Sequence, residues 1–382
     1  MGQRGPGVLT QRPVWDDEGW HALPSLDTET QADVSVVGLG GSGLAAVHEA
    51  LDRGMSVVGI DAGTLAGGAA GRNGGFLLAG PADAYHVAVE RLGQHRAAAI
   101  YRATLAEIDR MESATPESVS RRGSVRLSSS QEEDEDLHRQ HRALVSDGFE
   151  SELLRVGERV SLQFPRDASL QPLLRCRTLA RTAMARGARL YEHSPALSIS
   201  AGRVVTPAGS IATGAIVVAV DGGLDRVVPA LAGRIRTARL QMLATEPTDE
   251  VDIRCPVYAR WGFDYWQQLD SGAVVVGGLR DVHEADEWSH ETTTTQAVQR
   301  GLDDLLRNVV GVERAAVTHR WAGSVGFTAD HLPVFAEVDR RVVAIGGYSG
   351  TGNVIGALCG RAAVAYLADG STEMADVLAT RS

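Results

Sequence analysis

The sequence feature that most constrains the fold is a glycine motif near the N-terminus. The residues Gly38-Leu39-Gly40-Gly41-Ser42-Gly43 have the GxGxxG spacing and lie between an apolar run at 33–38 and a helix-like segment at 43–53. Because the motif follows a predicted strand and opens a predicted helix, it has the context of a dinucleotide-binding loop. Gly38 permits the tight turn, Gly40 the close approach of a pyrophosphate, and Gly43 the close packing of helix on strand.

A second apolar run, at 56–61, ends at Asp61, 18 residues after Gly43. A carboxylate at this position can accept hydrogen bonds from ribose hydroxyls. The N-terminus of the intervening helix offers free N–H groups and the positive end of its dipole to phosphates. We therefore predict a βαβ unit that binds a dinucleotide, either FAD or NAD(P).

The basic residues exclude several kinds of chemistry. The chain has 382 residues, enough for two to three folding units at roughly 150 residues each. It contains no lysine, so all 37 basic side chains are arginine. Schiff-base catalysis, pyridoxal-phosphate attachment and a Walker-type phosphate loop all need an ammonium side chain and are excluded. The net charge of −11, without a basic cluster, predicts that no nucleic acid is a partner.

Cysteine usage and hydropathy bear on metals, disulfides and location. Cys176, Cys255 and Cys359 are widely spaced, and no CxxC occurs. This favours neither a disulfide framework nor a metal site, and is typical of a reducing compartment. No apolar run approaches 18 residues and the N-terminus lacks an apolar signal segment, so we expect a cytoplasmic protein without an integral membrane segment. The oligomeric state stays open.

Residue patterns predict the remaining elements. Residues 1–32 are rich in Pro, Gly and acidic side chains and predict an arm that Trp15 and Trp20 pin to the body. Helical spacing predicts helices over 86–112, 130–148, 173–186, 293–310 and 352–369, and alternation predicts strands within 188–220, a hairpin over 257–280 and strands within 315–345.

Two further glycine-rich segments resemble those of a known family. One is GGAAGRNGGF at 67–76, and the other runs from Gly346 to Gly352 between a predicted strand and a predicted helix. The second follows Arg320-Trp321-Ala322-Gly323, Thr328, Asp330 and Pro333. In order and spacing, residues 30–370 resemble the FAD-dependent D-amino-acid oxidase / glycine and sarcosine oxidase family (DAO family). The GRNGG loop resembles that of its gamma-glutamylputrescine-oxidoreductase-like members.

The resemblance implies an α/β fold: a Rossmann-like FAD-binding domain of the glutathione-reductase type, with a second α+β substrate domain on a mixed or antiparallel sheet. The FAD-binding domain would be discontinuous and comprise 33–85, 151–231 and 316–382. The substrate domain would comprise 86–150 and 232–315, with the 257–280 hairpin as its central sheet over the flavin.

The resemblance also implies which residues would hold a non-covalent FAD. The first loop and the acid-ended strand would face the pyrophosphate and ribose, the GRNGG loop and the last helix's N-terminus would face the flavin ring, and two small residues would contact the cofactor through backbone. In sequence order these cofactor residues are Gly38, Gly40, Gly41, Ser42, Gly43, Asp61, Ala62, Gly71, Arg72, Asn73, Gly74, Gly75, Ala196, Gly222, Gly350, Thr351 and Gly352. A helix N-terminus stabilises negative charge that develops at the ring's pyrimidine edge.

The function implied by the resemblance is oxidation of a C–N bond in an amine or amino-acid-like substrate. Hydride would pass from the carbon beside the amine to flavin N5, giving an imine that hydrolyses, with oxygen or another electron acceptor completing the cycle. This chemistry needs positioning and a dry pocket more than a general base, so no catalytic acid or base is named.

Three positions depart from the family pattern. Where family members carry a carboxylate-binding cation, this sequence has Val325, Leu77 and Val354. A buried carboxylate without a cationic partner is costly, so simple α-amino acids are disfavoured unless another arginine takes over. Arg72, Arg260 and Arg280 are the candidates. The family's covalent-flavin cysteine also falls on Val325, and the oxygen-activating lysine has no counterpart.

The hairpin supplies the substrate-pocket candidates. Alternation places Tyr265 and Gln267 on one face, and with Tyr258 and Arg260 they are the predicted pocket residues. Two alternatives stay open: a flavoprotein subunit of a larger dehydrogenase, and a natural-product tailoring oxidoreductase that acts on a specialised, non-amino-acid substrate. An NAD(P)-linked reductase would leave the two later glycine-rich segments unexplained.

Overall fold

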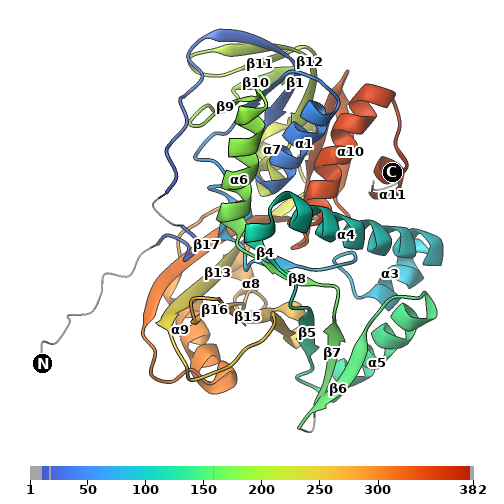
Figure 1. Cartoon of the computed structure of the whole chain (residues 1–382), viewed down its shortest axis with the longest axis vertical. Helices are drawn as coiled ribbons and strands as arrows, with labels where there is room; N and C mark the ends of the chain where they lie inside the picture. Colours follow the sequence, from blue (N-terminus) through green and yellow to red (C-terminus); the bar gives the residue numbers. More distant parts are fainter. Residues whose placement is uncertain (1–10, 17–18, 158, 379–382) are drawn as a thin grey trace, which may run out of the picture.

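The computed structural model describes residues 11–16, 19–157 and 159–378, which form two large sheets with helices packed around them (Figure 1). Residues 1–10 and 17–18 of the predicted arm lie outside the described residues. Both predicted anchors of the arm are confirmed. The Trp15 indole N–H donates to the Asn73 carbonyl at 3.1 Å, and that of Trp20 to Glu192 Oε1 at 3.0 Å. Trp15 is buried, so the arm is part of the core.

The first sheet carries the predicted βαβ unit. Its strands are β1 (Glu29–Val37), β2 (Val57–Ile60), β9 (Arg189–Tyr191), β10 (Ser198–Ser200), β11 (Arg203–Val205), β12 (Ser210–Val218), β18 (Val334–Asp339) and β19 (Val342–Gly346). The order is β10-β11-β12-β1-β2-β9, with β19 also paired to β12 and β18 to β19. Strands β1, β2, β9, β12 and β19 pair in parallel, so their carboxyl ends share one edge. This confirms the Rossmann-like α/β fold.

Close helix packing covers this sheet. Helices α1 (Gly41–Asp52) and α10 (Ile355–Asp369) lie against each other beside it (Figure 1). A Cβ at Gly360 of α10 would lie 2.1 Å from the Ser42 carbonyl oxygen of α1, so only glycine permits this approach. Buried apolar strand residues such as Val36 and Val217 join the two helices in one core.

The second sheet is antiparallel except at one pair. Its strands are β5 (Ser124–Leu127), β6 (Glu152–Val156), β7 (Arg159–Phe164), β13 (Arg236–Pro247), β14 (Val257–Ala259), β15 (Asp264–Gln268), β16 (Ala273–Gly277) and β17 (Val317–Phe327), in the order β17-β13-β16-β15-β14-β5-β7-β6. Only β14 and β5 pair in parallel. The mixed sheet expected for the second domain is thus confirmed, with the predicted 257–280 strands at its centre. A three-stranded sheet, β3 (Phe76–Leu77), β8 (Ala168–Leu170) and β4 (Val119–Ser120), lies apart from both.

Strand pairing departs from the expected segment boundaries. Strands β6 and β7 were expected with the FAD-binding segments, yet β7 pairs with β5 of the second sheet. Strand β17, expected with the C-terminal FAD-binding segment, pairs along its length with β13. The reason is that these strands find their hydrogen-bond partners far away in sequence. The domain division itself stays a prediction.

The remaining helices are α2 (Ala69–Arg72), α3 (Tyr85–Leu92), α4 (Gln94–Ala114), α5 (Gln131–Ser146), α6 (Pro172–Ala185), α7 (Leu224–Val227), α8 (Glu284–Glu287), α9 (Gln296–Leu305) and α11 (Glu373–Leu378). The single helix predicted over 86–112 is wrong, because Gly93, at φ 81°, ends α3 before α4 begins. Helix α9 continues into a π-helical turn, Leu306–Val310. Within the described residues, no helix combines the length and apolarity that crossing a membrane requires.

Candidate active site

A cavity of about 1000 Å³ lies where the two sheets meet. One wall is built from the loops after the parallel strands β1, β2, β12 and β19, and the other from residues of the second sheet. Ligands of open parallel sheets bind outside the carboxyl ends of the strands, and this cavity has that position.

The loop after β1 is shaped for a phosphate group. Gly38 has φ 99°, and a Cβ there would lie 2.4 Å from the Ala219 carbonyl oxygen. At Gly43 a Cβ would lie 1.8 Å from the Gly38 carbonyl oxygen, so α1 starts directly against the loop. The N-cap residue, Gly40, gives no side-chain cap, and the first turn holds no acidic residue. The first N–H groups of α1 are therefore left for an anion in the cavity.

Asp61 closes this part of the cavity. Its Oδ2 accepts the Leu39 N–H at 2.8 Å, and its Oδ1 accepts the Gly63 N–H at 2.9 Å. Burial raises the pKa of Asp61, against the opposing effect of these two N–H donors. Each carboxylate oxygen still has acceptor capacity, as hydrogen bonding to ribose hydroxyls requires.

The GRNGG loop is tied to the loop before α10 by two amides. Asn73 Nδ2 donates to the Ala70 carbonyl at 2.7 Å, and Asn353 Nδ2 donates to Asn73 Oδ1 at 3.0 Å and to the Phe76 carbonyl at 2.9 Å. The two glycine-rich segments that lie almost 280 residues apart in sequence therefore form one wall of the cavity.

A buried carboxylate holds the C-terminal glycine loop in place. Asp221, at φ 43°, accepts the N–H groups of Gly347 at 3.0 Å, Tyr348 at 3.3 Å and Gly326 at 3.2 Å. Burial raises its pKa, and the N–H donors oppose that effect. The sequence analysis missed Asp221. The available signal was its position directly after an apolar strand and before two glycines.

The second-sheet wall presents a row of residues that face one another across strands. Arg126, Tyr258, Tyr265, Gly277 and Met242 are successive register partners on β5, β14, β15, β16 and β13. Directly opposed residues share a face, and all of these except Gly277 line the cavity.

An aromatic group forms the centre of that wall. The ring centroids of Phe76 and Tyr258 are 5.0 Å apart, those of Phe76 and Tyr265 5.9 Å, and those of the two tyrosines 5.8 Å. Burial raises the pKa of both tyrosines well above the ordinary value, so both hydroxyls stay protonated at neutral pH. They can donate or accept hydrogen bonds from the apolar wall.

Most of the predicted site residues line this cavity. They are Gly38, Gly40, Gly41, Ser42, Asp61, Ala62, Arg72, Asn73, Gly74, Ala196, Gly350, Thr351 and Gly352 of the cofactor set, and Tyr258 and Tyr265 of the pocket set. Phe76, Arg126 and Phe327 also line it and were missed, because only the folded register brings them there.

Four predicted glycines do not line the cavity and have packing roles. Gly43 packs on Gly38, as described above. A Cβ at Gly71 would lie 2.4 Å from the Ala66 carbonyl oxygen, and one at Gly75 2.3 Å from that of Leu170. Gly222 is buried between Thr237 and Gly326, and its carbonyl accepts the Thr237 hydroxyl at 2.6 Å. Direct contact of these four with a cofactor is therefore the part of the prediction that needs correction.

Two pocket candidates also point elsewhere. Arg260 pairs with Asp264 at 2.5 Å and with Asp281 at 2.9 Å and does not line the cavity. Gln267 Nε2 donates to the carbonyls of Gly74 and Gly75, so it holds the GRNGG loop on the second sheet. Both assignments to the pocket are wrong, because each side chain's polar groups are satisfied by protein.

The three apolar departures from the family pattern also separate. Val325 lines the cavity, whereas Leu77 and Val354 pack together in a small core with Ile108 and Met111. Only Val325 therefore says anything about the polarity of the pocket.

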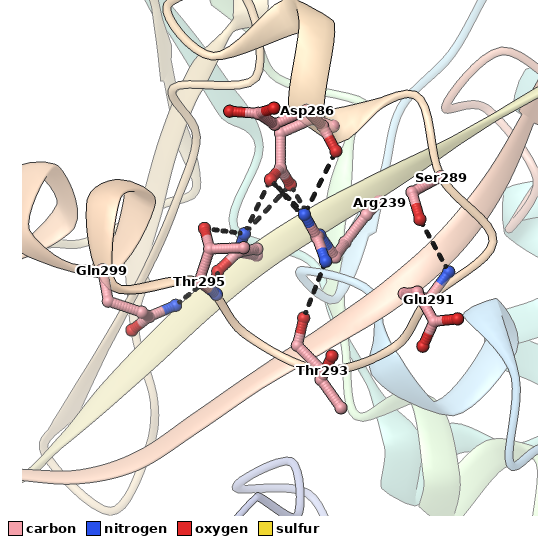
Figure 2. Close-up of polar contacts among 9 residues, drawn as sticks. Arg239, Asp286, Ser289, Glu291, Thr293, Thr295 and Gln299 are labelled. Carbon is pink, nitrogen blue, oxygen red and sulfur yellow. Dashed lines mark hydrogen bonds and ion pairs between the residues drawn. The ribbon is translucent and has the colours of Figure 1, made fainter.

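A buried ion pair anchors the loop that covers the second-sheet end of the cavity. Arg239 of β13 contacts Glu287 of α8 at 2.8 Å, with side chains 8% and 1% exposed. Figure 2 shows Arg239 also donating to the carbonyls of Asp286 and Thr293, at 3.2 and 3.3 Å. Gln241 Nε2 adds hydrogen bonds of 3.0 Å to Glu287. The loop from α8 to α9 is thereby fixed to β13.

These features together define a dinucleotide-binding oxidoreductase fold. The uncapped helix start, the glycines that admit no Cβ, and the carboxylate at the end of β2 fit the pyrophosphate and ribose of FAD. The family model described as "FAD dependent oxidoreductase" (DAO) matches residues 33–367, and the chain belongs to this family. It is an FAD-dependent oxidoreductase.

Individual relatives are more distant. The chain is 26% identical to "Probable oxidoreductase OrdL" of Rhizobium meliloti strain 1021, over 96% of this chain and 88% of that one. It is 25% identical to "Gamma-glutamylputrescine oxidoreductase" of Escherichia coli K12, over 93% and 88% of the two chains. Among solved structures it resembles glycine oxidase from Geobacillus kaustophilus, with a TM-score of 0.77, 20% identity, and coverage of 92% and 99%. This last likeness concerns the fold.

Proposed function

We propose that the protein oxidises the C–N bond of an amine or amino-acid-like substrate. When bound, FAD supplies the hydride acceptor at flavin N5. The observation that carries the proposal is that a single cavity brings the three glycine-rich segments and the Tyr258–Tyr265 wall together. The printed names of similar proteins, a gamma-glutamylputrescine oxidoreductase and a glycine oxidase, support the same class of substrate.

The residues of this chain act in the reaction by position and by exclusion of water. Tyr258 and Tyr265 keep their protons, and their hydroxyls orient the nitrogen of the substrate. Phe76, Val325 and Phe327 line the same space and keep it apolar. The amine must enter neutral, because a dry pocket without a carboxylate partner disfavours an ammonium group. The imine product then leaves for hydrolysis in water.

The cofactor is held without a covalent bond in this proposal. None of the three cysteines lines the cavity, and two of them, Cys176 and Cys359, are buried in the core. Burial raises the pKa of the Cys176 thiol to about 11, so it stays unreactive at neutral pH.

Anaerobic reduction tests the proposal. The purified holoprotein is mixed without oxygen with D-amino acids, N-methyl amino acids and polyamine derivatives, and the flavin absorbance band is followed. Bleaching by one of these classes is expected. Tyr265→Phe keeps the ring but removes the hydroxyl, and should slow bleaching between about twofold and tenfold. Bleaching only by a substrate without a C–N bond beside a hydrogen-bearing carbon would instead support the tailoring alternative, and none without a partner chain the subunit alternative.

A further inference from the structure

Four arginines surround the second-sheet side of the cavity, and three of them have polar partners. Arg72 donates to the carbonyls of Gly67 at 2.8 Å and Ala322 at 3.0 Å. Arg126 donates to Gln140 at 3.3 Å, and Arg260 forms two ion pairs. Arg280 lines the cavity and makes no hydrogen bond or ion pair with the part of the chain that is described.

Aromatic rings surround the free guanidinium. The Cζ atom of Arg280 lies 4.6 Å from the ring centroid of Phe327, 5.2 Å from that of Trp288 and 5.4 Å from that of Phe263. These rings take water away from the cation, and burial lowers its pKa from the ordinary value. Five N–H donors in a fixed planar arrangement therefore face a weakly hydrated space.

The backbone holds Arg280 in this position. Gly278, at φ 148°, and Leu279, at φ 64°, turn the chain sharply after β16. The Leu279 N–H donates to Asp264 Oδ1 at 3.3 Å, and Trp288 belongs to the loop that the Arg239–Glu287 pair anchors. A cation whose position is set before a ligand arrives loses little entropy on binding.

Two nearby carboxylates limit the charge that this site can accept. Asp281 is paired with Arg260, and Glu284 Oε1 accepts the Trp288 indole N–H at 3.0 Å. Both act on Arg280 through their charge without contacting it. One free cation beside two carboxylates suits a singly charged anion better than a doubly charged phosphate.

We propose that Arg280 is the anion anchor of the substrate pocket and binds a carboxylate of the substrate through its free N–H groups. This rests on the proposed function, and it narrows the substrate to amines that carry a carboxylate. The guanidinium takes over the task for which the pocket offers only Val325 at the position that the family pattern indicates. A planar carboxylate accepts two parallel N–H bonds from arginine, which fixes its orientation as well as its position.

Binding of unreactive carboxylates tests Arg280 separately from oxidation. Monocarboxylates from acetate to hexanoate, and the neutral amide of each, are titrated into the holoprotein while the flavin absorbance is followed. We expect at least one carboxylate to bind the wild type better than its amide. Arg280→Met should weaken that binding roughly tenfold or more, and Arg280→Lys should retain part of it.

Matched variants make the result specific. Arg236 lies 3.9 Å from the Trp288 ring but does not line the cavity, so Arg236→Met should bind the carboxylate as the wild type does. Arg126→Met tests the other cation of the wall. Equal affinity for carboxylate and amide in the wild type, unchanged affinity in folded Arg280→Met, or an equal loss in Arg126→Met would each overturn the assignment. These titrations need no turnover, so they stand whether or not an amine is oxidised.

Discussion

The ring of Tyr265 occupies the space that a side chain at position 277 would need. A Cβ built on Gly277 lies 2.3 Å from Tyr265 Cε2 and 2.7 Å from its hydroxyl oxygen. The two residues are register partners on β15 and β16. The cavity-facing position of Tyr265 therefore depends on the absence of a side chain on the neighbouring strand.

Gly277→Ala should displace the Tyr265 ring into the cavity and cost about 1–3 kcal/mol of unfolding free energy, as overpacking does. Urea unfolding measures the loss, and substrate KM or carboxylate affinity reports the blocked pocket. In the double variant Gly277→Ala/Tyr265→Ala the clash is absent, so its cost should be smaller than the sum of the two single costs. Additive costs would contradict the relationship.

The ion pair beneath the covering loop leads to a second prediction. Arg239→Met leaves Glu287, 1% exposed, without its cation, and should lower the unfolding free energy by about 3–5 kcal/mol. Denaturant unfolding checks this value, and Trp288 fluorescence should show the loop loosening. The matched control is Arg320→Met, which breaks the more exposed pair with Asp303 at 2.8 Å and should cost at most about 1 kcal/mol. Equal losses would argue against the role of burial.

A third prediction concerns pH at the edge of the cavity. His331 lies 2.6 Å from Asp83, and this hydrogen bond raises the pKa of His331. A raised folded-state pKa stabilises the protein below about pH 6.5, and that contribution is lost as pH rises through the raised value. The side chain is 50% exposed, so solvent screening keeps the effect below about 1 kcal/mol.

The stability difference between wild type and His331→Gln should therefore be larger at about pH 6 than at about pH 8.5. Thermal melts at constant ionic strength measure this difference. Asp83→Asn removes the acceptor charge and should flatten the same pH dependence. A difference that grows with pH would mean that another group titrates.

Two glycines of the first loop provide the fourth prediction. Gly43→Ala forces a Cβ to within 1.8 Å of a backbone oxygen and should cost about 3 kcal/mol or more, with loss of FAD from the purified protein. At Gly41 no heavy atom lies within 4 Å of the place that a Cβ would take, so Gly41→Ala should leave the apoprotein as stable as wild type or slightly more stable. Melting of the two apoproteins compares them directly, and similar behaviour would show that the loop has other freedom to adjust.

Local patterns were sufficient to predict the first βαβ unit. Strand β1, helix α1 and strand β2 lie within four residues of the expected bounds, since GxGxxG and Asp61 act over short distances. The mixed second sheet followed from the family resemblance and from alternation at 257–280. The break at Gly93 was missed, because the apolar spacing continues on both sides of it.

Partners distant in sequence explain the errors in the site. Arg260 was a reasonable pocket candidate, but its neutralisation by Asp281 depends on how β14 and β16 lie in the sheet. Gln267 faces the side predicted by alternation, yet a loop almost 200 residues earlier in the chain uses its amide. No sequence pattern distinguishes Arg280 from Arg260, and the distinction arises only from the contacts each makes.

The order of strands in the two sheets determines when this protein can fold during its synthesis. Strand β12 pairs with β1, about 180 residues upstream, and with β19, more than 120 residues downstream. The ribosome must release nearly the whole chain before β13 finds β17. Until then the nascent polypeptide exposes unpaired apolar strand edges, which favour aggregation. Premature termination before residue 317 should therefore yield an insoluble fragment instead of a smaller folded unit.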